Sequence, residues 1–197
     1  MRTHRIIGVV MSLMVLLINN NGTHAQTAAT KPTTNPGQVP PYTLTPIQIR
    51  ELKGSTIIYK SMQTTLNSIA KALEQPMLDL EKALTESKIG MTNGPVLIYK
   101  GVTPDPNAQF TLEIAIPVAD DAKAPQGYQT RRLEGARSAV VLYTGPTTDM
   151  GPAYQELLPQ IFQLGLTPTQ EVRERYLYWE SDESKNNVVM IEIPLAQ

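Results

Sequence analysis

A repeated motif constrains the fold of this chain more than any other feature of its sequence. The pattern Gln-x-Arg-x-Leu-x-Gly begins at Gln48 and again at Gln129, and both copies lead into a run rich in β-branched residues. Farther along, Tyr99 corresponds to Tyr176. The separation between copies falls from 81 residues at the motif to 77 at the tyrosines, which predicts a helix about one turn shorter in the second copy. The chain is therefore predicted to be an internal duplication.

Each copy is predicted to form a strand, a helix and two further strands. The motif glycine lies inside the opening strand, which is therefore one bent strand or two short ones. In each helix, apolar residues recur at steps of three and four, and an internal proline predicts a kink or a break. The expected elements are helices with apolar stripes from Met62 to Leu84 and from Tyr154 to Leu164, with Pro76 and Pro159 inside them and Gly165 as a cap, and closing strands at 96–101, 110–118, 172–179 and 188–195.

Two such units, at about 47–118 and 128–195, predict one α+β domain. We expect a curved, mostly antiparallel sheet with both helices on one face and a central cleft near the pseudo-twofold axis. A chain of about 150 residues is long enough to bury a hydrophobic core of its own.

The first 25 residues have the layout of a secretory signal peptide. Two arginines precede an apolar run at 6–18, a polar segment follows, and cleavage is expected after Ala25. The apolar run is shorter than the roughly 20 residues of a stable transmembrane span. Residues 26–46 are rich in Thr and Pro and predict an extended linker. We therefore expect an exported protein, periplasmic or secreted, whose folded domain lies at 47–197.

The residue inventory excludes several kinds of site. The chain has no cysteine, and its two histidines, His4 and His24, both lie in the predicted signal peptide. Catalytic triads, zinc sites with His or Cys ligands, haem with an axial His and disulfides are therefore not expected, and neither is any metal or cofactor. The net charge is −1 and would be near −3 without the two leading arginines. With no cluster of Lys and Arg, a nucleic acid partner is not expected.

Several segments, taken in order, resemble GyrI-like domains, the effector-binding modules found alone or fused to AraC-type and MerR-type regulators. In the first repeat the resemblance is carried by Lys-Ile-Gly and Gly-Pro-Val-Leu-Ile-Tyr within 88–99. In the second it is carried by Leu142–Pro146, Ala153–Leu157, Glu174–Tyr176 and Ile193–Leu195. The resemblance spans about 45–195 and implies a small-molecule-binding module that recognises cationic or polar aromatic ligands.

The resemblance assigns the central role in ligand recognition to Glu174. Independently, Glu174, Tyr176 and Tyr178 fall on one face of a regular strand, because side chains alternate with a period of two. A carboxylate between two aromatic rings offers both charge and cation–π contacts to a cation. Tyr99, the counterpart of Tyr176, is expected on the opposite side of the cleft, whereas Leu97 takes the place equivalent to Glu174.

Structural alternatives remain open for each of these residues. Because Glu174 lies between Arg173 and Arg175, it could be one more charge on a solvated strand. The tyrosines could serve packing alone, since aromatic residues favour strands. Tyr154, on the second helical stripe, could line the pocket, but the core is the favoured position.

Three functions remain compatible with the sequence. The first is a module that captures an aromatic, cationic molecule at Glu174, Tyr176, Tyr178 and Tyr99. The second is a metal-free hydrolase of reactive small molecules, with Glu174 as general base after burial has raised its pKa. The third is an interaction or inhibitor module that docks through its surface. The sequence does not fix the oligomeric state.

Overall fold

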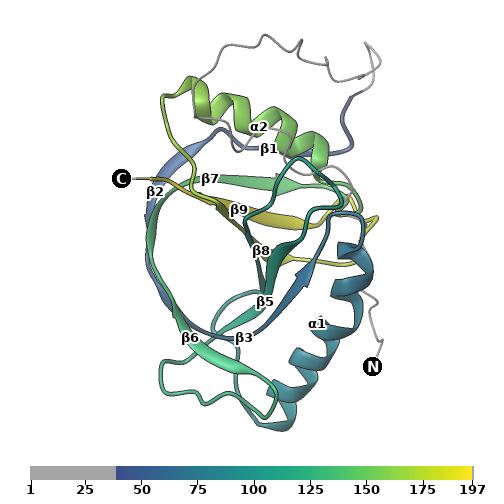
Figure 1. Cartoon of the computed structure of the whole chain (residues 1–197), viewed down its shortest axis with the longest axis vertical. Coiled ribbons are helices and arrows are strands. Elements are labelled where there is room, and N and C mark those ends of the chain that lie inside the picture. The colour runs from purple at the N-terminus through teal and green to yellow at the C-terminus, as the bar shows by residue number, and fades with distance from the viewer. Residues whose placement is uncertain (1–38, 197) are drawn as a thin grey trace.

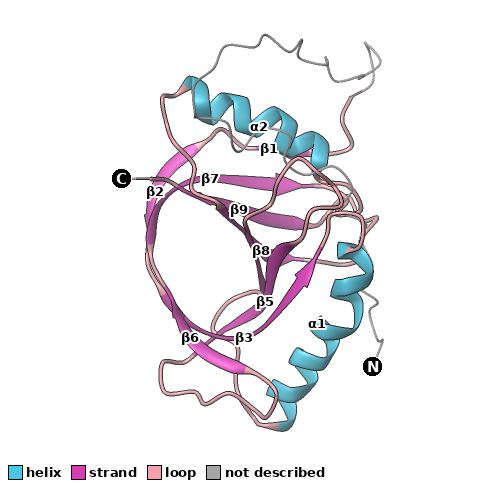
Figure 2. Cartoon of the chain, viewed as in Figure 1, coloured by secondary structure: helices cyan, strands magenta, loops and turns pink. Residues whose placement is uncertain are grey.

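The structure is a computed structural model that describes residues 39–196. The predicted signal peptide and most of the predicted linker lie outside the described residues. The chain forms nine strands and two helices within the described range (Figures 1 and 2). The elements are β1 (Thr43–Leu44), β2 (Gln48–Leu52), β3 (Ser55–Thr64), α1 (Ile69–Glu86), β4 (Val96–Lys100), β5 (Phe110–Val118), β6 (Gln129–Leu133), β7 (Ala136–Thr144), α2 (Gly151–Gln163), β8 (Glu171–Tyr178) and β9 (Val188–Pro194).

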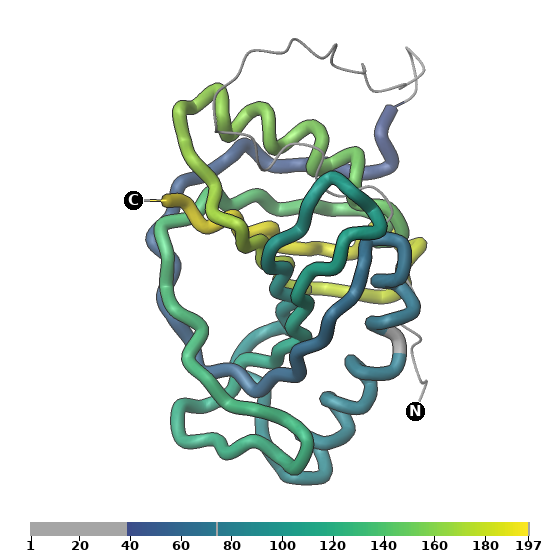
Figure 3. Tube along the Cα trace, in the orientation of Figure 1, coloured from purple at the N-terminus to yellow at the C-terminus, as the bar shows by residue number. Residues whose placement is uncertain are grey.

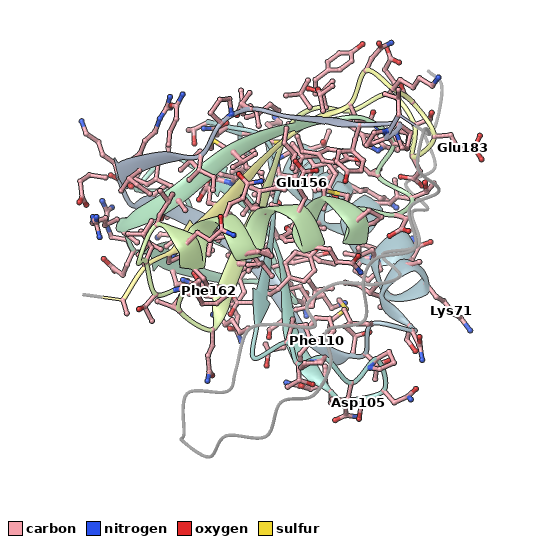
Figure 4. All side chains as sticks on the ribbon, turned by 90° about the horizontal axis from the view of Figure 1, so that it is seen from above. Lys71, Asp105, Phe110, Glu156, Phe162 and Glu183 are labelled. Atoms are coloured by element: carbon pink, nitrogen blue, oxygen red, sulfur yellow. The ribbon has the colours of Figure 1, made fainter. Side chains whose placement is uncertain are left out.

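The strands form one curved sheet in which every strand pairing is antiparallel. The order is β1-β7-β9-β8-β4-β5-β3-β6, with β2 also paired to β7. Both helices contribute to the main hydrophobic cluster on one face of this sheet, and α2 lies across the sheet when the molecule is seen from above (Figure 4). The predicted α+β class, the duplication in the order of elements and the placement of both helices are confirmed.

The repeated motif marks the point where each repeat exchanges partners with the other. Strand β2 pairs with β7 of the second repeat, and β6 pairs with β3 of the first, so two long bent ribbons run side by side (Figure 3). The bends fall at Gly54 and Gly135. A Cβ atom on Gly54 would lie 2.8 Å from the carbonyl oxygen of Leu133. A Cβ atom on Gly135 would lie 2.4 Å from the carbonyl oxygen of Leu52. Only glycine allows the two backbones to approach so closely.

The register between β4 and β8 places the pseudo-twofold axis at one residue pair. Leu97 lies opposite Glu174, and the flanking pairs, Val96 with Arg175 and Ile98 with Arg173, are equivalent under the 77-residue repeat. Two residues that correspond in sequence therefore face each other across neighbouring strands at the centre of the sheet. One is apolar and the other is an acid, so the centre of a symmetric backbone is chemically asymmetric.

The helices differ from their predicted form in two respects. Met62 belongs to β3 and not to the first helix, because the ten-residue strand extends to Thr64. The prolines break neither helix: α1 runs for 18 residues with Pro76 inside it, and α2 runs for 13 residues with Pro159 inside it. Both helices bury an apolar face against the sheet, and this packing outweighs the roughly 3 kcal/mol that an internal proline costs. The second helix is shorter, as the spacing predicts.

The N-terminal edge of the described chain belongs to the sheet. Thr43–Leu44 pair with β7, and the ring of Tyr42 stacks on Tyr143 at a centroid distance of 5.5 Å. The Thr45 hydroxyl accepts a hydrogen bond from the Leu142 amide. The sheet therefore begins before residue 46, and Tyr42 and Leu44 pack against the main hydrophobic cluster.

The two helices end in the same backbone motif with different residues. After α2, Gly165 has φ of +71° and its amide bonds to the Phe162 carbonyl, as expected for a glycine cap. After α1, Lys88 has φ of +57°, and its amide bonds to the Thr85 carbonyl. The 77-residue repeat relates Lys88 to Gly165. A left-handed backbone costs a residue with a Cβ atom about 1–2 kcal/mol, so the first helix carries strain that the second does not.

We predict that Lys88→Gly raises the free energy of unfolding by about 0.5–1 kcal/mol, since relief of the left-handed strain exceeds the added entropy of the unfolded chain. Urea denaturation of the two proteins measures the difference. Gly165→Ala is the matched control and should lower stability, because a Cβ atom there meets open space and only the backbone is strained. Equal stability of Lys88→Gly and wild type would contradict this account of the cap.

Candidate ligand-binding site

A buried carboxylate surrounded by tyrosine hydroxyls lies at the centre of the sheet. Glu174 is 0% exposed. Its Oε2 accepts hydrogen bonds from the hydroxyls of Tyr99 at 2.8 Å and Tyr176 at 3.4 Å, and its Oε1 accepts one from Tyr154 at 2.7 Å. No Lys or Arg side chain of the described residues forms an ion pair with it. Phenolic donors thus stabilise this acid in place of a cation.

Burial has the largest effect on the ionisation of Glu174. Desolvation raises the pKa of its carboxyl above the usual value, and the hydrogen bonds from Tyr154, Tyr99 and Tyr176 offset part of that rise. Desolvation and the nearby carboxylate also raise the pKa of the Tyr99 hydroxyl well above its usual value. The tyrosines therefore stay protonated and act as donors, and a cation that enters this region would meet a carboxyl group whose charge no ion pair offsets.

The strand β8 directs alternate charges to opposite faces of the sheet. Arg173 and Arg175 point away from Glu174 and pair with Glu171 and Glu192 on the other face. The alternative in which Glu174 is a solvated surface charge is therefore wrong. The flanking arginines are separated from it by the sheet and do not neutralise it by contact.

A cavity of about 350 Å³ lies between α1 and the end of β8, beside the buried acid. Leu97 and Tyr176 line it, and these residues are the strand partner and a hydrogen-bond partner of Glu174. Glu174, Tyr99 and Tyr154 lie behind this wall and do not line the cavity. Its lining residues are Leu73, Met77, Glu81, Gly94, Pro95, Leu97, Thr147, Tyr176, Leu177, Tyr178, Trp179 and Asp182.

The lining of this cavity is apolar, aromatic and acidic. Glu81 and Asp182 are its charged residues, and no Lys or Arg belongs to the lining. Desolvation raises the pKa of the Glu81 carboxyl. Asp182 is buried, and its Oδ1 accepts hydrogen bonds from Thr147 and from the Trp179 indole. The lining thus has three aromatic side chains and two acids, and a third acid, Glu174, lies behind the wall. Such a site favours an organic cation over an anion.

Tyr178 does not join the group around Glu174 as regular strand alternation predicts. The pairing of β8 with β9 shifts register between Tyr176 and Tyr178, which is the signature of a β-bulge. Tyr178 is 50% exposed, and its hydroxyl donates to Glu180 Oε1 at 2.7 Å. It still lines the cavity, as a half-exposed wall residue. The predicted site residues thus separate into a buried group of Glu174, Tyr99 and Tyr176 and a cavity wall that includes Tyr176 and Tyr178.

Tyr154, for which the sequence favoured the core over a place in the pocket wall, also belongs to the site. It is buried, as predicted, but its hydroxyl also donates the shortest of the three hydrogen bonds to Glu174. The 77-residue repeat relates Tyr154 on α2 to Met77 on α1, and Met77 lines the cavity. The sequence signal for this role was a hydroxyl group on an otherwise apolar helical stripe, since a buried tyrosine hydroxyl requires a hydrogen-bond partner.

Residues 39–196 contain neither a metal centre nor a membrane-spanning helix. Across residues 39–196, no group of His, Cys, Asp and Glu side chains is arranged to hold a metal ion. Neither described helix is long and apolar enough to cross a membrane.

A family model and solved structures both match this chain. The model of the GyrI-like small molecule binding domain matches residues 45–196. None of the curated protein sequences matches the chain. The crystal structure of the EcmrR C-terminal domain aligns with a TM-score of 0.64 at 16% identity, over 79% of this chain and 98% of that one. SAV2435 bound to tetraphenylphosphonium aligns with a TM-score of 0.55 at 12% identity, over 76% and 93%.

A longer EcmrR chain, from a cryo-EM complex with DNA, aligns with a TM-score of 0.66 at 14% identity. The alignment covers 81% of this chain but only 59% of the EcmrR chain. At these low identities, the structural alignments establish a shared fold and no more.

The raised pKa of Glu174 predicts a pH-dependent difference between wild type and Glu174→Gln. As pH rises above about 4.5, the unfolded carboxyl loses its proton while the folded one retains it, so wild-type stability falls up to the folded-state pKa. Glutamine does not titrate. The stability of Glu174→Gln relative to wild type should therefore increase with pH through this interval, as measured by urea denaturation from about pH 4 to about pH 8. Parallel stability curves would contradict a raised pKa.

Proposed function

The chain belongs to the family of GyrI-like small molecule binding domains, and we propose that it binds a lipophilic organic cation in the cavity between α1 and β8. One observation carries the proposal: the lining combines Tyr176, Tyr178 and Trp179 with the acids Glu81 and Asp182 and contains no basic residue. The fold neighbour SAV2435 was solved with tetraphenylphosphonium, a ligand of this chemical class.

Glu174 supplies the buried negative charge in this proposal. A monovalent cation in the cavity lies on the far side of Tyr176 and Leu97, inside a region of low polarity where charges interact strongly. The hydrogen bond from Tyr176 to Glu174 is the one most easily broken, since it is the longest of the three and the Tyr176 side chain is partly exposed. Rotation of this ring would open a direct path from the cavity to the carboxylate while Tyr99 and Tyr154 keep it in place.

Specificity would follow from the same arrangement. Leu73 and Met77 on α1 offer flexible apolar contacts, and the aromatic rings offer faces to a cation, each worth on the order of 1 kcal/mol. A hydrophilic cation would lose its hydration on entry without regaining hydrogen bonds, and an anion would meet three carboxylates. We therefore propose aromatic or bulky alkyl cations as the ligand class.

Binding of tetraphenylphosphonium, measured by isothermal titration calorimetry, tests this proposal. We predict saturable binding to the wild-type protein and an affinity about tenfold or more weaker for Glu174→Gln, because the buried charge is lost. Triphenylphosphine oxide, a neutral aromatic analogue, should bind wild type and Glu174→Gln alike. Glu183→Gln is the matched control, since Glu183 is exposed at the periphery (Figure 4) and does not line the cavity.

Equal affinity of wild type and Glu174→Gln for the phosphonium cation would contradict the role of Glu174.

Hydrolysis is the second candidate function, favoured by the raised pKa of Glu174, which suits a general base. It requires a water molecule beside a carboxylate that already accepts three tyrosine hydroxyls. Turnover of an epoxide that is lost in Glu174→Gln would favour it over binding alone.

We further propose that the protein acts after export, with a small molecule and no nucleic acid as its partner. The support is the signal-like segment 1–25 and the absence of a Lys/Arg cluster from the sequence. N-terminal sequencing of the protein recovered from the producing cells should begin at Gln26. A protein that retains Met1 and stays in the cytosol would overturn this part of the proposal.

A further inference from the structure

A second cavity, of about 220 Å³, lies on the face of the sheet opposite Glu174. Its charged lining residues are Lys53, Arg173, Arg175 and Glu192, and Ser55 and Asn93 add polar side chains. Arg173 and Arg175 alternate with Glu174 along β8 and therefore point to this face. Two of these cations are paired with acids, Arg173 with Glu171 and Arg175 with Glu192, and Lys53 leaves an excess of positive charge, the reverse of the first cavity.

Arg175 is held in place at its Nε, while its Nη groups have no protein partner among the described residues. It is 9% exposed, and its Nε donates to Glu192 Oε1 at 2.8 Å, while Glu192 is itself 1% exposed. Within residues 39–196, neither Nη group of Arg175 donates a hydrogen bond to a protein acceptor. A guanidinium with a fixed orientation and two unused parallel donors presents the geometry that binds carboxylate and phosphate oxygens in a bidentate manner.

The other two basic side chains of the cavity differ in how firmly they are held. Arg173 is 7% exposed and is fixed by hydrogen bonds from Nε to Glu171 Oε1 at 2.6 Å and from Nη1 to the Glu134 carbonyl at 3.0 Å. Lys53 is exposed at the bend between β2 and β3, and no acid among the described residues lies within ion-pair distance of it. The cavity therefore combines two preorganised guanidinium groups with one long, adjustable ammonium group at its edge.

We propose that this second cavity binds a small oxyanion, either a phosphate or a carboxylate group. The Nη donors of Arg175 would bind two oxygens of the anion, Lys53 would close over it from the bend, and the Ser55 hydroxyl and Asn93 amide would donate to the remaining oxygens. Glu192 orients Arg175, and the free Nη groups bind an anionic oxygen more strongly than a neutral one. This site is independent of the cation site, because the sheet separates them.

Titration of the full-length protein with inorganic phosphate and with succinate, at constant ionic strength set by chloride, tests the proposal. Backbone amide NMR shifts should saturate for residues around Lys53, Asn93 and Arg175, and the stronger of the two anions identifies the preferred group. Lys53→Ala should weaken binding about fivefold to tenfold, as expected for the loss of one charged contact. Lys185→Ala, which removes an exposed lysine outside the cavity, should leave binding unchanged.

Arg175→Lys separates recognition from folding, since a lysine can keep the ion pair with Glu192 but lacks the forked donors. We expect a folded protein whose anion affinity falls about tenfold or more. Shifts that do not saturate, or equal affinities for wild type, Lys53→Ala and Lys185→Ala, would overturn the proposal as non-specific charge screening. Because Glu174 is untouched in these variants, failure here leaves phosphonium binding in the first cavity unaffected, and the reverse also holds.

Discussion

The burial of Glu174 without a cation is the interaction on which the rest of the site depends. An ionised carboxylate removed from water costs several kcal/mol unless donors replace the lost hydration, and three tyrosine hydroxyls from β4, α2 and β8 do so here. Their convergence requires the two repeats to meet at the centre of the sheet. The site is thus a property of the duplicated fold as a whole and could not form within one repeat.

Divergence between the repeats makes the centre of a symmetric backbone chemically asymmetric. At three related positions the second repeat carries a different side chain from the first: Glu174 replaces Leu97, Tyr154 replaces Met77 and Gly165 replaces Lys88. Tyr154 reaches the acid, whereas Met77, its counterpart, lines the cavity. The acid belongs to the second repeat, both repeats line the cavity, and the two meet at the Leu97–Glu174 pair.

The sequence predicted the features that repetition and periodicity determine, which are the duplicated order of elements, the antiparallel sheet and the meeting of Glu174 with Tyr99 and Tyr176. It did not predict features that depend on tertiary contacts. The bulge after Tyr176 changes the direction of Tyr178, and the hydroxyl of Tyr154 finds an acid that lies 20 residues away along the chain. The prolines inside both helices are tolerated because of packing against the sheet, which no local pattern reveals.

The most direct test of the central role of Glu174 is its pKa, measured by NMR of the labelled side-chain carboxyl carbon with and without a saturating phosphonium cation. A cation held next to this group should lower its raised pKa, while the pKa of Glu113, which pairs with basic residues on the opposite face of the sheet, should not respond. A neutral aromatic ligand should leave both pKa values unchanged. An unaltered pKa of Glu174 in the presence of bound cation would show that the buried acid is not the counter-charge.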